Sequence, residues 1–169
     1  EYHPNTLTDD SDSAVRLMTE INRPNARLYW QPDFKKSRGE LFRGLSLALP
    51  WVEVLHVFTW LPSGEKRPLA EGHDFWTDVF REIPGLADKK LLLEFVPDND
   101  PAVLPREAQT LRAWESEVIG MKQAKKIRAA WVNGGGDAGS DAEGGSDLRN
   151  VEHAKQHAER RDRRRILMN

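Results

Sequence analysis

Four polar residues stand at or inside the ends of short apolar segments, where they could bind a metal or move a proton. They are Glu1 in EYHP, Gln31 in YWQP, His56 in LHVF and Glu94 in LLLEF. A carboxylate inside an apolar segment is costly to bury alone, so Glu94 needs a cation or strong hydrogen-bond donors. Two carboxylates and an imidazole that converge on one point make a site for Mn²⁺, Mg²⁺ or Zn²⁺.

Each of these residues also has an ordinary structural explanation. A single histidine such as His56 is more often a hydrogen-bonded core residue, and a single carboxylate such as Glu94 is more often half of a salt bridge. The four residues nevertheless occur in register at the ends of successive apolar segments, and this repetition favours a shared site. We therefore predict that Glu1, Gln31, His56 and Glu94 face one polar hollow.

The segments that must position these residues alternate between short apolar runs and longer runs with helical spacing. The short runs are rich in β-branched and aromatic residues and end in turn residues, which is typical of strands. The longer runs repeat apolar residues every three or four positions behind capping residues, which is typical of amphipathic helices. We predict strands at residues 26–30, 52–60 and 91–96, and helices at residues 13–21, 40–49, 75–83 and from Asp100 onward.

This alternation predicts an α/β fold with a parallel sheet. The strands are almost entirely apolar, as expected for a sheet that is covered on both faces. A barrel and a doubly wound open sheet both give this pattern. No glycine-rich phosphate loop follows any of the strands, so a dinucleotide site is not supported. In parallel barrels the functional groups stand at the carboxyl ends of the strands, which is where Gln31, His56 and Glu94 occur.

Composition limits the class of the protein and its partners. The chain has 169 residues, a formal net charge of -2 and no cysteine. This charge gives no general attraction to nucleic acid or to an anionic membrane. No apolar run approaches the roughly 18 residues of a membrane-spanning helix. The absence of cysteine excludes disulfides and thiolate sites and fits a cytoplasmic protein, which is the localisation we expect.

The order and spacing of five motifs resemble the sugar phosphate isomerase/epimerase superfamily, whose members have a xylose isomerase-like TIM barrel. The resemblance covers roughly residues 1–118 and implies that the chain is the carboxy-terminal half of a (β/α)8 barrel. A complete barrel has about 250 residues, so we expect a fragment of a longer enzyme. The motifs are EYHP from Glu1, WQP from Trp30, LHVF from Leu55, RPLAEGHDFW from Arg67 and LLLEF from Leu91.

The resemblance implies a role for each of the four polar residues. Glu1 and Glu94 match catalytic carboxylates that also bind the metal, and His56 matches a histidine ligand. Gln31 falls where the family usually places an aspartate ligand, and its neutral amide oxygen is expected to bind a divalent cation more weakly. Phe34 stands where the family commonly has a further histidine. The expected cofactor is a divalent metal, namely Mn, Mg or Zn.

Residues near the same strand ends are candidates for binding the substrate. His3 follows Glu1 by two positions, and Trp30 and Trp60 stand close to strand ends. Arg67 could contact a sugar phosphate or a hydroxyl group. Each of these residues has a plain alternative, which is backbone capping for His3, loop packing for the tryptophans and an exposed hairpin charge for Arg67.

The resemblance implies a sugar (phosphate) isomerase or epimerase. Such an enzyme removes a proton next to a carbonyl of a small sugar or polyol, and two carboxylates exchange the proton while a metal polarises the oxygens. Two other classes stay open. One is a degenerate, non-catalytic barrel that acts as a binding or assembly module. The other is an endonuclease IV-like phosphodiesterase, for which this chain supplies few histidine and aspartate ligands.

The expected domain organisation follows the composition along the chain. Residues 1–133 are expected to form the (β/α)4 half barrel, residues 134–147 a flexible Gly/Asp-rich linker, and residues 148–169 a basic helical tail. A half barrel leaves two open strand edges, which are prone to pair with another chain. We therefore expect an amino-terminal half, or a second copy of this chain in a homo-oligomer, as partner.

Overall fold

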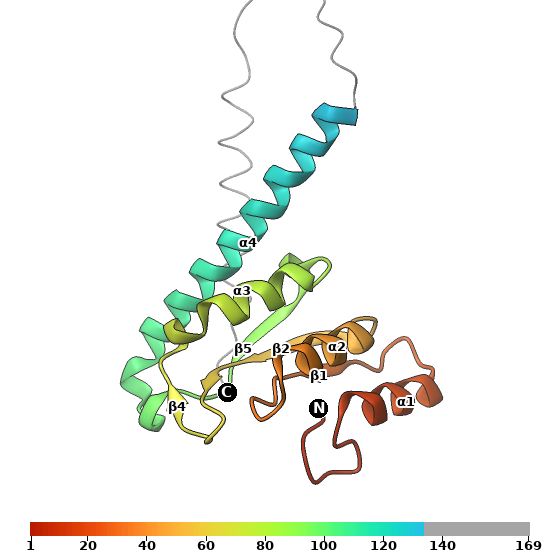
Figure 1. The fold of residues 1–169 in the computed structure, drawn as a ribbon, viewed down its shortest axis with the longest axis vertical. Helices are drawn as coiled ribbons and strands as arrows, with labels where there is room; N and C mark the ends of the chain where they lie inside the picture. The colour runs from red at the N-terminus through yellow and green to blue at the C-terminus, as the bar shows by residue number, and fades with distance from the viewer. Residues whose placement is uncertain (134–169) are drawn as a thin grey trace, which may run out of the picture.

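The computed structural model describes residues 1–133, which form a mixed α/β fold (Figure 1). The predicted linker at residues 134–147 and the predicted tail at residues 148–169 lie outside the described residues. The helices are α1 (Ser11–Ile21), α2 (Arg38–Ala48), α3 (His73–Glu82) and α4 (Leu104–Asn133). The strands are β1 (Leu28–Trp30), β2 (Val52–Val57), β3 (Thr59–Trp60), β4 (Lys66–Arg67) and β5 (Lys90–Leu93). Short 3-10 turns occupy Leu69–Gly72, Leu86–Asp88, Pro97–Asn99 and Pro101–Val103.

Three of the strands form a parallel sheet in the order β1-β2-β5. Tyr29 pairs with Val54 in the first ladder, and His56 pairs with Leu92 in the second. The predicted α/β class with a parallel sheet is therefore confirmed. Within residues 1–133 this sheet is open rather than closed into a barrel, and residues 1–10 contain no strand.

The apolar run at residues 52–60 forms two strands, so the prediction of a single strand there was wrong. β2 ends at Val57, and β3 begins at Thr59 and pairs antiparallel with β4 in a hairpin. The indole nitrogen of Trp76 donates to the carbonyl oxygen of Phe58 at 2.8 Å. A backbone group that already has this partner is not available to extend the ladder, so the hydrogen bond marks the point where the chain leaves the sheet.

One face of the parallel sheet packs against all four helices. Trp30 and Leu55 from the sheet, Phe80 from α3 and Leu111 from α4 are buried in the same hydrophobic cluster. On the opposite face Tyr29 lies edge-on to the ring of His56, with 5.2 Å between ring centroids. Side chains of successive strand residues point to opposite faces, so this division follows directly from the strand period.

Capping boxes fix where α1 and α2 begin. The Asp10 side chain accepts from the backbone N–H of Ser13 at 2.8 Å, while the Asp10 N–H donates to the Ser13 hydroxyl. Ser37 and Glu40 make the same reciprocal pair at the start of α2. Such caps contribute about 1 kcal/mol each. Asp10 is thus the cap of α1, and α2 starts two residues before the predicted boundary because Ser37 is its cap.

The last helix begins close to its predicted start. Asp100 accepts from the N–H of Ala102 at 2.9 Å and caps a short 3-10 turn, after which α4 runs from Leu104. In Figure 1, α4 crosses beside α3 and then extends away from the rest of the described fold. Among residues 1–133, none of the helices combines the length and the apolar character needed to cross a membrane.

Candidate functional site

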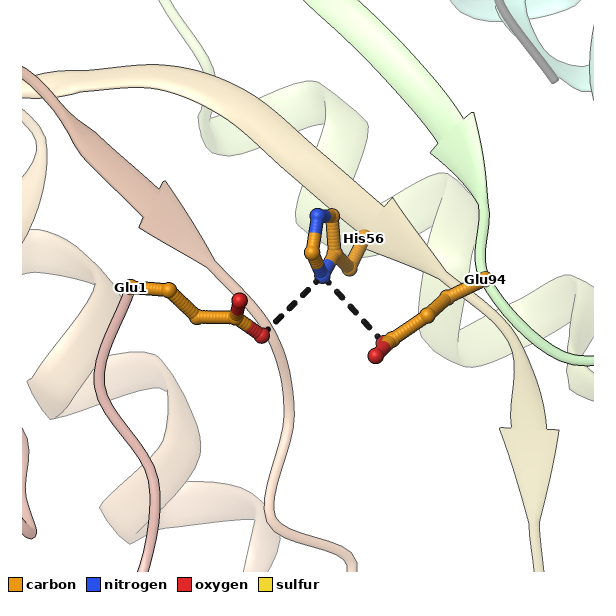
Figure 2. Close-up of side chains that lie close together, drawn as sticks. All are labelled: Glu1, His56 and Glu94. Carbon is orange, nitrogen blue, oxygen red and sulfur yellow. Dashed lines mark ion pairs between the residues drawn. The ribbon is translucent and has the colours of Figure 1, made fainter. Parts of the chain in front are cut away.

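Side chains from the strand ends and from the start of the chain meet at one edge of the parallel sheet (Figure 2). His56 lies in β2, whereas Gln31 and Glu94 directly follow β1 and β5. The carboxyl ends of neighbouring parallel strands lie side by side, so three strand-end positions far apart in the sequence become neighbours. Glu1 approaches from a segment without secondary structure and points toward His56 in Figure 2.

The neighbour of Glu1 explains how an irregular segment is held in place. Tyr2 is 7% exposed and belongs to the hydrophobic cluster. Its hydroxyl lies 2.9 Å from the Ser11 hydroxyl at the first turn of α1. Burial raises the pKa of the Tyr2 hydroxyl, which keeps the group neutral. This packing and hydrogen bond anchor the segment and direct Glu1 toward the sheet edge.

Glu1 and Glu94 both approach a single nitrogen of His56. The distance from His56 Nδ1 to Glu1 Oε1 is 3.2 Å, and the distance to Glu94 Oε2 is also 3.2 Å. One ligand atom from each of the three residues lies within 4.8 Å of the other two. The structure thus brings three of the four residues predicted as metal ligands to one point. The fourth predicted ligand is Gln31.

The environment of His56 favours its charged form despite burial. Burial is the largest single influence and lowers the pKa, but the close contact and charge of Glu94, followed by the charge and close contact of Glu1, outweigh it. The net result is a pKa above the usual value for histidine. In the absence of a cation, a protonated His56 would therefore offset part of the charge of the two carboxylates.

The donor set also fits a divalent cation. His56 Nδ1 is buried, and neither nearby carboxylate oxygen lies in the direction in which a ring N–H would point. The 3.2 Å contacts are therefore close without being well-directed hydrogen bonds. Ligand atoms about 2.0–2.1 Å from a tetrahedral zinc ion lie about 3.3 Å from one another, which is near the 3.2 Å that separates His56 Nδ1 from each carboxylate oxygen. The residues present thus suit a metal with mixed nitrogen and oxygen ligands.

Gln31 lies against the same two carboxylates. With its amide nitrogen turned toward them, it donates to Glu94 Oε2 at 3.0 Å and to Glu1 Oε1 at 3.3 Å. With the amide reversed, its oxygen occupies that position instead. The predicted grouping of Gln31 with Glu1, His56 and Glu94 is therefore present in the geometry.

A hollow of about 530 Å³ opens beside this cluster, with Glu1, Gln31 and Glu94 among its lining residues. This volume is sufficient for a small organic ligand. An aromatic wall stands on another side of the hollow. It consists of Phe34, Phe58, Trp60 and Phe95, whose successive ring centroids lie 5.7, 5.1 and 4.7 Å apart.

Two of the residues predicted to bind substrate line this hollow. His3 is exposed at its margin, and Trp60 belongs to the aromatic wall. The indole Nε1 of Trp60 is buried and has no hydrogen-bond partner among the residues that the structure describes. A buried donor without a partner costs about 1–3 kcal/mol.

The other two predicted substrate residues lie elsewhere. Trp30 is 2% exposed and packs edge-on against Trp76 in the core, with 6.2 Å between ring centroids. Arg67 donates to Glu71 at 2.9 Å and to Glu65 at 2.8 Å, and it borders a different surface hollow. The geometry therefore gives no support to substrate contacts by Trp30 or Arg67, which stay predictions.

Sequence analysis did not single out Phe58 and Phe95 as wall residues. Phe58 follows His56 by two positions, and Phe95 directly follows Glu94, so both leave the strands next to predicted site residues. An aromatic residue beside a strand-end ligand was the available signal. A single strand over residues 52–60 would give Phe58 no special position, whereas the end of β2 at Val57 places it next to the site.

Comparison of the chain with protein-family models, with curated proteins and with solved structures gives no match. The superfamily resemblance therefore remains a prediction, and the function must be argued from the site.

Proposed function

We propose that this chain is part of a sugar (phosphate) isomerase or epimerase that moves a proton between carboxylates at a divalent metal site. The observation that carries the proposal is the convergence of Glu1, His56 and Glu94, whose ligand atoms lie within 4.8 Å of one another at the carboxyl ends of parallel strands. The adjoining hollow and its aromatic wall support the proposal, because they offer space and a binding surface beside the candidate ligands.

A half barrel is the architecture that best accommodates this arrangement. The described helices share one hydrophobic cluster with one face of the sheet, and His56 lies on the other face. In a TIM barrel the helices cover the outer face only, whereas a doubly wound sheet has helices on both faces. The open edges of β1 and β5 would pair with an amino-terminal half or with a second copy of this chain.

The carboxylates would carry the proton in this reaction. One of Glu1 and Glu94, in its ionised form, would remove and keep a proton from the substrate carbon next to the carbonyl, and the facing carboxyl group, in its protonated form, would return its own proton to the substrate. His56 lies within 3.2 Å of both oxygens and keeps the two groups directed at the same point. Glu1, Gln31, His56 and Glu94 would hold the metal, which when bound would polarise the substrate oxygens.

The aromatic wall would define which substrates bind. The C–H face of a small sugar or polyol is apolar and can pack on Phe58, Trp60 and Phe95. The free indole N–H of Trp60 would donate to a substrate oxygen. A ligand held between this wall and the carboxylates would have its reacting carbon close to Glu1 and Glu94.

The direct test replaces one carboxylate and keeps its shape. Glu94→Gln is expected to reduce turnover of ketoses or inosose-like polyols with Mn²⁺ by about 100-fold or more, because a positioned general base contributes about that factor. Turnover is measured on the protein in its assembled form, and Mn²⁺ binding is measured by calorimetry on this chain. The control is Glu20→Gln, which removes an exposed carboxylate on α1. Unchanged turnover in Glu94→Gln would contradict the proposed pairing.

A binding or assembly module is the second candidate, and Gln31 is the observation that favours it. Its amide nitrogen can satisfy both carboxylates without any cation. This candidate predicts that ligands bind in the hollow in the presence of EDTA and are not converted. An endonuclease IV-like activity has less support, since the candidate cluster within residues 1–133 contains one histidine.

A further inference from the structure

Gln31 is the neutral member of the four polar residues at the strand ends. It directly follows β1 and lies between two buried residues, Trp30 and Pro32. These neighbours fix the backbone, so the side chain changes by rotation about its own bonds. A half-turn of the amide exchanges its oxygen and its nitrogen. Gln31 can therefore present either an acceptor or two donors to the same point.

With its nitrogen turned inward, the amide bridges the two carboxylates. It contacts Glu94 Oε2 at 3.0 Å and Glu1 Oε1 at 3.3 Å. These are the same two oxygens that lie 3.2 Å from His56 Nδ1. Hydrogen bonds to ionised acceptors are about twice as strong as those between neutral groups. The bridge therefore offsets the repulsion between two carboxylates that share one site.

The opposite orientation suits a site that contains a cation. The amide oxygen then faces the oxygens of Glu1 and Glu94, and three oxygens directed at one point repel one another unless a positive charge lies between them. With a cation present, the same oxygen becomes a further ligand beside the carboxylates and His56. The preferred orientation of the amide thus depends on whether the site is filled.

We propose that Gln31 acts as a reversible bridge, whose amide nitrogen joins Glu1 to Glu94 in the metal-free protein and whose oxygen turns inward when a divalent cation binds. Only the second half of this inference rests on the proposed function. Binding a cation requires that the bridge is first broken. Gln31 therefore stabilises the empty site and lowers the affinity of the site for metal.

A carboxylate at this position would reverse both effects. Glutamate has the same length as glutamine, so Gln31→Glu keeps the volume of the side chain and replaces two donors by a third negative charge. In the empty site the three carboxylates would repel one another. In the filled site the additional charge would strengthen binding, because the affinity of oxygen-rich sites rises with the charge of their ligands.

The first measurement is the stability of the metal-free protein. Thermal unfolding at pH 8 in EDTA is compared for the wild type, Gln31→Glu and the control Gln109→Glu, which changes an exposed residue of α4. We expect Gln31→Glu to lower Tm by about 4 °C or more, the shift that the loss of one strong hydrogen bond produces in a domain of this size. The control should unfold at the wild-type temperature.

The second measurement is metal affinity, by calorimetric titration with Mn²⁺ alone. Gln31→Glu is expected to bind Mn²⁺ about tenfold more tightly than the wild type, or tighter still. Gln109→Glu should bind with wild-type affinity. A variant that is less stable when empty and binds metal more tightly has the combination that the bridge requires, since a simple loss of packing would weaken both properties.

A third measurement follows the amide itself. In the metal-free wild type, NMR should show side-chain N–H₂ resonances of Gln31 that exchange slowly with water. Addition of Zn²⁺ should abolish this protection, because the nitrogen turns away from the carboxylates. The amide of exposed Gln109 should exchange rapidly in both states.

The outcomes separate this inference from the proposed function. An unchanged metal-free Tm in Gln31→Glu, or rapid exchange of the Gln31 amide without metal, would overturn the bridge even if Mn²⁺ binds to the wild type. Failure of the wild type to bind Mn²⁺ or Zn²⁺ would overturn the proposed function and the reversal of the amide, and the Tm of Gln31→Glu would still decide whether the bridge exists.

Discussion

Two histidines of this chain each contact two carboxylates, and they do so in different ways. At His56 both carboxylates approach the same nitrogen, Nδ1, at 3.2 Å. At His73, the first residue of α3, Asp74 contacts Nδ1 at 3.1 Å and Glu117 contacts Nε2 at 3.2 Å. The first arrangement directs three ligand atoms at one point, whereas the second distributes the partners around the ring.

The surroundings of the two rings differ as much as their partners do. The His56 side chain is 10% exposed and contacts Glu1 and Glu94, which line the hollow of about 530 Å³. The His73 side chain is 43% exposed and links α3 to Glu117 of α4. The pKa of each histidine is raised above its usual value. At His73 the cause is Asp74 and then Glu117. At His56 burial lowers the pKa, but Glu94 and Glu1 outweigh it. A raised pKa therefore does not identify a site, and convergence on one atom is the better criterion.

The strongest way to break this comparison is to remove each ring and measure Mn²⁺ binding. His56→Leu is expected to weaken binding by more than about 100-fold, because a direct ligand is lost and second-shell losses alone cost about 10–100-fold. His73→Leu should bind Mn²⁺ with wild-type affinity. Calorimetry on both variants checks this. Equal losses in the two variants would show that metal binds through general negative charge rather than at the convergent cluster.

A second experiment concerns the hollow. Of the two histidine clusters, only the one at His56 has residues that line it. Trp60→Phe keeps an aromatic ring in the wall and removes the unpartnered indole N–H. We expect the affinity for a bound sugar or polyol to fall about fivefold to tenfold, which corresponds to one net hydrogen bond. The control is Trp51→Phe, a partly buried tryptophan outside the wall. Equal affinities in calorimetric titrations of wild type and Trp60→Phe would exclude the indole as a donor.

The smallest expected effect concerns His73 and pH. A histidine whose pKa is raised by folding contributes stability that is complete below its unfolded pKa of about 6.5 and is lost as pH rises through the folded pKa. The contribution should be at most about 1 kcal/mol, because the ion pairs with Asp74 and Glu117 are largely exposed. His73→Gln should therefore be less stable than the wild type at about pH 5.5 and equally stable at about pH 9. Urea unfolding at the two pH values tests this. A difference that persists at the higher pH would assign it to packing against Trp114 instead.

Alternation along the chain was enough to predict which strand ends meet. Parallel pairing of β1, β2 and β5 follows from short apolar runs separated by helical spacing, and it brings Gln31, His56 and Glu94 together. Glu1 is different, because its position depends on the burial of Tyr2 rather than on a strand. No local pattern indicates that packing, so the sequence alone does not show what holds Glu1 in place.

The predicted roles of the tryptophans illustrate a second limit. Trp30 directly precedes Gln31, so the strand period places its side chain on the face opposite to that of Gln31, in the core. This could have been deduced from the sequence. Trp60 could not be placed in this way, because β2 ends before Trp60. The hydrogen bond that marks this end joins Phe58 to Trp76, and these two residues are distant in the sequence.

One side chain, Lys66, connects the β3-β4 hairpin to the segment after β5 through two contacts. Lys66 in β4 donates to Asn99 at 2.5 Å, and its ammonium group lies 5.0 Å from the ring centroid of Phe95. The same ammonium group therefore contacts two residues of the segment after β5. Outward displacement of the hairpin would break both contacts at once. Lys66 thus keeps the hairpin that carries Trp60 next to Phe95, and the two rings of the wall stay in contact.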